Sequence, residues 1–84
     1  MVQQFGANAQ NIKKRYAVLV FIKGSAAPLV LYVKEPQVFY QEILDKMKST
    51  NTVLIERETD GPVKKVCFNS QQVSAVAIQE EQYM

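Results

Sequence analysis

Two short apolar stretches decide the fold, YAVLVFI at residues 16–22 and LVLYV at residues 29–33. Both are rich in β-branched and aromatic residues, which favour strands. The first strand is expected to stop at Gly24, and a turn of small residues with Pro28 at its end leads into the second. Because this connection is short, we expect the two strands to form an antiparallel hairpin.

The next segment predicts a helix that begins at Pro36, since proline is tolerated at the first helical position. Its large apolar residues have the spacing of one helical face: Phe39, Tyr40, Ile43, Leu44 and Met47. Ser49-Thr50-Asn51 is expected to end the helix, with Asn51 as a candidate for the left-handed conformation.

Three further strands are expected after the helix, at residues 52–59, 63–68 and 73–79. Asp60-Gly61-Pro62 predicts the hairpin turn between the first two, because glycine adopts positive φ without strain. Charged residues flank this turn, so its tip is expected to project into water as the most mobile part of the sheet structure. The acidic end from Glu80 onward is expected to be frayed.

The order β-β-α-β-β-β predicts a single α+β domain over residues 13–84, with a mainly antiparallel sheet and one helix packed on one face. Residues 1–12 are rich in Gln, Asn, Ala and Gly, and we expect them to form a flexible N-terminal tail. The composition, 48% apolar and 21% charged over 84 residues, is that of one globular domain.

Both faces of the first hairpin are apolar, because side chains alternate between the faces of a strand. One helix covers only one face, so the second needs another cover. Three covers remain open: the N-terminal tail, curling of the sheet into a partial barrel, or another chain. The last favours a non-enzymatic interaction module, either a homodimer or bound to a protein partner. Its candidate protein interface comprises Leu19, Phe21, Val30 and Tyr32.

Positive charge gathers in the N-terminal part of the chain. Residues 1–34 hold five bases and no acid, whereas residues 35–84 hold five bases and eight acids. Such asymmetry can indicate a nucleic-acid surface, or it can be balanced inside the fold if acidic strands pair beside basic ones. The alternative function is therefore weak nucleic-acid binding by cations beside an aromatic ring, through Lys13, Lys14, Arg15, Tyr16 and Lys23.

Enzymatic chemistry has little support in the sequence. The chain has no histidine, which removes the commonest general base and metal ligand. The single cysteine, Cys67, is expected to be buried and inert between Val66 and Phe68. Glu56 and Glu58 share a strand face and are expected to be solvated. We therefore expect no enzyme activity, no cofactor and no metal.

The location is expected to be cytoplasmic. One cysteine excludes an internal disulfide and is compatible with a reducing compartment. Residues 16–33 are interrupted by Lys23 and Pro28, which argues against a membrane span. A secretory signal is not expected either, because Lys23 ends the apolar run at the shortest usual length.

Overall fold

The computed structural model describes residues 13–83, and the structural statements below refer to that part of the chain. Its strands and α-helix follow the predicted order and form an α+β fold, which confirms the fold class. The elements are β1 (Lys13–Ile22), β2 (Leu29–Leu31), α2 (Pro36–Lys48), β3 (Leu54–Glu58), β4 (Lys65–Asn69), the single 3-10 turn η1 (Ser70–Gln72) and β5 (Val73–Tyr83). The predicted N-terminal tail, residues 1–12, lies outside the described residues.

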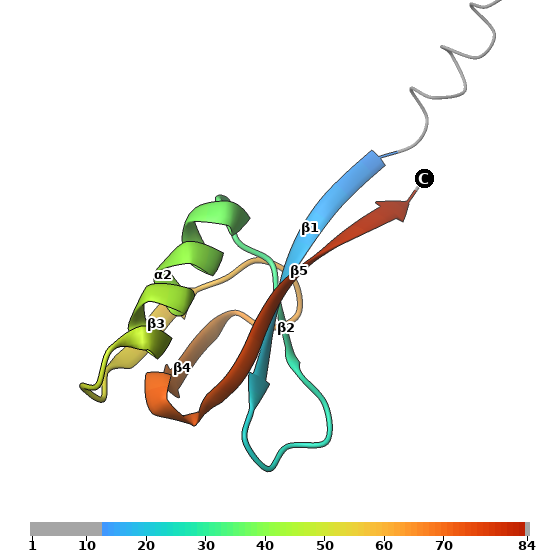
Figure 1. Cartoon of the computed structure of the whole chain (residues 1–84). Helices are drawn as coiled ribbons and strands as arrows, with labels where there is room; N and C mark the ends of the chain where they lie inside the picture. Colours follow the sequence, from blue (N-terminus) through green and yellow to red (C-terminus); the bar gives the residue numbers. More distant parts are fainter. Residues whose placement is uncertain (1–12, 84) are drawn as a thin grey trace, which may run out of the picture.

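The strands form two antiparallel sheets, one of three strands in the order β2-β1-β5 and one that consists of β3 and β4. The central strand β1 pairs with β2 only over Val18–Val20, but with β5 from Lys13 to Ile22. The β1–β5 ribbon therefore runs on beyond the helix, as Figure 1 shows.

The expected frayed end at Glu80 is wrong, because β5 continues to Tyr83 and pairs with the basic start of β1. Two ion pairs link these segments: Lys14 Nζ lies 3.7 Å from Glu80 Oε2, and Arg15 Nε lies 3.0 Å from Glu81 Oε1. Opposite charges on neighbouring strands support pairing where apolar alternation has ended. The charge asymmetry of the sequence is thus partly balanced within the fold.

The helix begins at Pro36 as predicted and buries Phe39 and Ile43. It ends at Lys48, where the N–H of Ser49 donates to the carbonyl of Lys46. Asn51 does not adopt the left-handed conformation suggested for it, since no non-glycine residue in the described part has positive φ. No helix in residues 13–83 is long and apolar enough to cross a membrane.

The core lies on one face of the three-stranded sheet, where α2 and the β3–β4 hairpin both contribute side chains. Its buried members are Val18, Val20, Leu31, Phe39, Ile43, Ile55, Val66, Phe68 and Val73. The core residues that β1 and β2 contribute all lie on the same face of the sheet, as the alternation of side chains along a strand predicts. The other face of the sheet therefore points away from the core.

The β3–β4 turn is exposed at Asp60, Pro62 and Lys64, as predicted, but it is anchored to the rest of the fold, so the prediction that it projects freely beyond the core is wrong. The N–H of Asp60 donates to the carbonyl of Tyr32 at 2.7 Å, and the two residues form an isolated β-bridge. Gly61 has the predicted positive φ of 86° and lies so close to the Tyr32 ring that an added Cβ would meet Cδ2 at 2.9 Å. Thr59, just before the turn, is buried.

Cys67 is exposed, which corrects the expectation of a buried thiol. Its neighbours Val66 and Phe68 point into the core, so alternation turns Cys67 to the outer face of β4. There it pairs in register with Glu56 of β3. Glu56 and Glu58 lie on the same outer face and are exposed, as expected.

Candidate protein interface on the sheet

The strand register brings together five apolar side chains on the sheet face away from the core. Leu19 is paired with Val30 on one side and with Ala77 on the other, and Phe21 is paired with Ala75. Val30 is 37% exposed, Ala75 is exposed, and the other three are half-buried. None of them belongs to the core cluster or packs against it. We call Leu19, Phe21, Val30, Ala75 and Ala77 the apolar strip.

Tyr32 differs from the other three predicted interface residues because its side chain makes polar contacts. Its hydroxyl lies 3.0 Å and 3.2 Å from the two carboxylate oxygens of Glu81, to which it donates. In the sheet order β2-β1-β5 this contact crosses β1, and Ala17, which is fully buried, lies on the same face. The Tyr32 side chain therefore covers the sheet rather than standing free for a partner.

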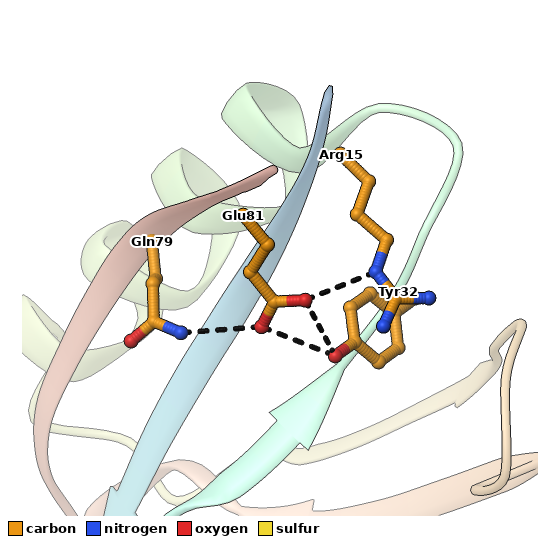
Figure 2. A network of polar contacts seen from close by, with 4 residues as sticks. All are labelled: Arg15, Tyr32, Gln79 and Glu81. Carbon is orange, nitrogen blue, oxygen red and sulfur yellow. Dashed lines mark hydrogen bonds and ion pairs between the residues drawn. The ribbon is translucent and has the colours of Figure 1, made fainter. Parts of the chain in front are cut away.

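Tyr32 and Glu81 belong to a polar network with Arg15 and Gln79, shown in Figure 2. The Nε of Arg15 donates to Glu81 at 3.0 Å, and Gln79 donates to the other carboxylate oxygen at 3.1 Å. The Arg15 guanidinium also lies 4.2 Å from the centre of the Tyr32 ring, within the range of a cation–π contact. All four side chains lie at one end of the apolar strip.

The contacts in this network shift the pKa values of its members in the directions that favour a charged Glu81 and a charged Arg15. Hydrogen bonds from Arg15 and Tyr32 lower the pKa of the Glu81 carboxyl. The hydrogen bond to Glu81 raises the pKa of the Arg15 guanidinium. Burial, together with the same carboxylate, raises the pKa of the Tyr32 hydroxyl. At neutral pH Glu81 is therefore an anion that accepts hydrogen bonds from a cation and a neutral phenol.

The structure separates the five residues that were predicted to contact nucleic acid. Alternation along β1 puts Lys14 and Tyr16 on one face and Lys13 and Arg15 on the other. Lys14 and Arg15 are ion-paired with glutamates of β5. Lys23 follows the far end of the ten-residue strand, roughly 30 Å from Lys13 at the usual rise of a strand. The five residues therefore do not form one compact basic patch.

A second charged cluster links the helix to the β3–β4 hairpin. Glu42 of α2 forms ion pairs with Arg57 of β3 and with Lys46, which lies one helical turn further on. Burial works against ionisation of Glu42, but hydrogen bonds from Arg57 and Lys46 outweigh it and lower the pKa. Within residues 13–83, no group of three or more His, Cys, Asp or Glu side chains is placed to hold a metal ion.

Sequence reasoning missed Ala75, Ala77, Gln79 and Glu81 as parts of this surface. Their strand was expected, but only the β1–β5 register shows which face each side chain occupies. The two alanines carried a weak signal, because small residues alternate with Val76 and Ile78 there. For Glu81 the signal was its charge, since an acidic segment can pair beside a basic one, but the end of the chain was expected to fray.

Comparison with known proteins gives no relative: no family model, no curated protein and no solved structure matches the chain. A function for the chain therefore has to be inferred from its own surface. On the sheet face away from the core, the apolar strip lies next to a hydrogen-bonded polar network.

Proposed function

We propose that this protein is a non-enzymatic interaction module that self-associates by burying the apolar strip against a second copy. The observation that supports this proposal is that Leu19, Phe21 and Val30 lie close together on the sheet face away from the core, where Val30 is 37% exposed and the other two are half-buried. Large contiguous apolar patches are rare on soluble monomers and mark binding surfaces.

The composition of the face resembles that of an interface. An apolar centre is bordered by hydrogen-bonded polar groups, and the charged residues are displaced to the edge. The network also fixes Arg15 and Glu81 in place, which lowers the entropic cost of ordering this rim when a partner binds. The face is thus preorganised for contact.

A second copy suits this face because both signs of charge occur at its polar end. A two-fold axis places the same patch of both copies against each other. Arg15 of one copy can then approach Glu81 of the other without like charges meeting. A partner of a single charge sign would find only one of these groups complementary.

The strength of the contact follows from its size. Complete burial of a Leu, Phe or Val side chain contributes about 1.5–3 kcal/mol, and these side chains are already partly buried. Association costs roughly 4–15 kcal/mol in lost translation and rotation. The strip alone therefore supports a weak complex, with a dissociation constant of about micromolar or higher.

Sedimentation equilibrium over a wide range of micromolar concentrations tests the proposal. The average mass should rise with concentration, and Leu19→Lys should weaken association by at least about tenfold, roughly 1.4 kcal/mol. Leu54→Lys is the matched control, because Leu54 is 68% exposed on the outer face of the other sheet. Its substitution should leave the mass unchanged.

A monomeric mass at every concentration would overturn the proposal. So would an equal loss of association in the Leu19→Lys and Leu54→Lys variants. If Leu19→Lys instead unfolded a monomer, the strip would be covered within one chain.

A further inference from the structure

The outer edge of β5 differs from the other edges of its sheet because the strand is long and lacks proline and lysine; its only charges are Glu80 and Glu81, and its bulge lies near Val73. β5 is 11 residues long, about twice the usual length of a strand, and it contains no Lys, Arg, Pro or Gly. In the three-stranded sheet it pairs only with β1, so its second edge has no strand beside it among the described residues.

The remaining edges of this sheet carry the features that natural proteins use against edge-to-edge pairing. β2 is three residues long and follows directly after Pro28. Beyond β2, the free edge of β1 carries Lys13 and Lys14. β5 therefore differs from these edges in its greater length and in its lack of proline and lysine.

Alternation identifies the backbone groups that face outward from β5. The N–H of Lys23 donates to the carbonyl of Gln72, and an extra residue in β5 interrupts the register between Phe21 and Ile22. Counting from there, every second residue of β5 directs its N–H and C=O away from β1. These residues are Val76, Ile78, Glu80 and Gln82.

We propose that the outer edge of β5 pairs antiparallel with β5 of a second copy, so that two three-stranded sheets form one six-stranded sheet. A two-fold axis near Ala77 places Val76 opposite Ile78 of the second copy. Glu80 then lies opposite Ser74 of the second copy, so no like charges meet. This self-complementarity favours a second copy over an unrelated strand.

The pairing also extends the apolar strip. Ala75 and Ala77 lie on the strip side of β5, next to the proposed axis. The strips of the two copies would join through these alanines into one continuous apolar face. This edge contact is distinct from the face contact proposed above, and the two together close into an assembly of four chains only if their two-fold axes are perpendicular and intersect.

Isotope-filtered NOE spectroscopy on a mixture of labelled and unlabelled full-length chain tests the edge contact. We expect intermolecular contacts between backbone protons of β5 in the two copies. Glu80→Pro should abolish them because proline removes an outward N–H, and an edge strand tolerates proline. Glu80→Ala, which removes the same side chain and its ion pair with Lys14, should retain them.

Intermolecular contacts confined to Leu19, Phe21 and Val30 would overturn the edge proposal and leave the face proposal standing. Absence of all intermolecular contacts in a monomeric sample would overturn both. Retention of the β5 contacts in Glu80→Pro would also overturn the edge proposal. If Glu80→Pro failed to fold, the spectrum of the unsubstituted mixture would still decide.

Discussion

The hydroxyl of Tyr32 donates a hydrogen bond at 3.0 Å to the carboxylate of Glu81, a residue 49 positions away on the opposite side of β1. The same tyrosine also contacts the β3–β4 turn: its carbonyl accepts a hydrogen bond from the N–H of Asp60, and its ring lies next to Gly61. Tyr32 therefore connects three parts of the fold, and it closes one end of the sheet face that bears the apolar strip.

The hydrogen bonds to Glu81 predict a specific dependence of stability on pH. Arg15 and Tyr32 hold the pKa of this carboxyl below its ordinary value of 4.5. The stability that they contribute is therefore complete above that value and is lost as the pH falls through the lower, folded-state pKa. Glu81→Gln should lose less stability than the unsubstituted protein on acidification through this range, as measured by urea unfolding at each pH.

A direct titration of Glu81 tests whether these hydrogen bonds are the cause of its lowered pKa. In a carbon-detected NMR titration, its side-chain carboxyl should have a midpoint below 4.5. Arg15→Gln should move that midpoint upward, because the hydrogen bond from the guanidinium is then removed. A midpoint that does not respond to Arg15→Gln would contradict this account of the network.

The two glycines with positive φ should respond differently to substitution by alanine. At Gly24, where φ is 83°, an added Cβ would have no atom within 4 Å, whereas at Gly61 it would lie 2.9 Å from the Tyr32 ring. Backbone strain of about 1–2 kcal/mol applies to both. Gly61→Ala should therefore lower the free energy of unfolding more than Gly24→Ala, as measured by urea denaturation.

A Tyr32→Ala background provides the control for this comparison. Without the ring, the costs of Gly61→Ala and Gly24→Ala should become similar. Equal costs in the unsubstituted background would mean that the β3–β4 turn is not docked on Tyr32.

The position of Cys67 predicts that its thiol is accessible in the folded protein. Iodoacetamide should modify it in native buffer at a rate close to that in denaturant, because the side chain lies on the outer face of β4. Mass spectrometry of the intact chain over time measures both rates. Modification that requires denaturant would show instead that Cys67 is covered.

Much of the fold follows from local sequence patterns. Pro36 and the spacing of Phe39 and Ile43 locate the helix, and Gly61 marks a turn with positive φ, because each depends only on nearby residues. The placement of Leu19, Phe21 and Val30 on the same face of the sheet was also predicted correctly, because side chains alternate between the two faces once a strand is located.

Contacts between distant residues account for the errors. The acidic end of β5 is a strand because it pairs with basic residues of β1, not because of its own composition. The β3–β4 tip docks on Tyr32, and no pattern within the hairpin reveals that acceptor. Cys67 is different: the alternation of Val66 and Phe68 already placed it on the outer face, and only its small apolar character suggested burial.

The central claim, that the apolar strip is buried by a second copy, is tested most directly by the solvent exposure of its methyl groups. A soluble paramagnetic agent broadens the NMR signals of exposed methyl groups, and the effect on Leu19 and Val30 can be compared with that on Leu54 in the same sample. As protein concentration rises, broadening should fall for Leu19 and Val30 and stay constant for Leu54, which is 68% exposed on the other sheet. Broadening of Leu19 and Val30 that does not change with concentration would contradict the claim.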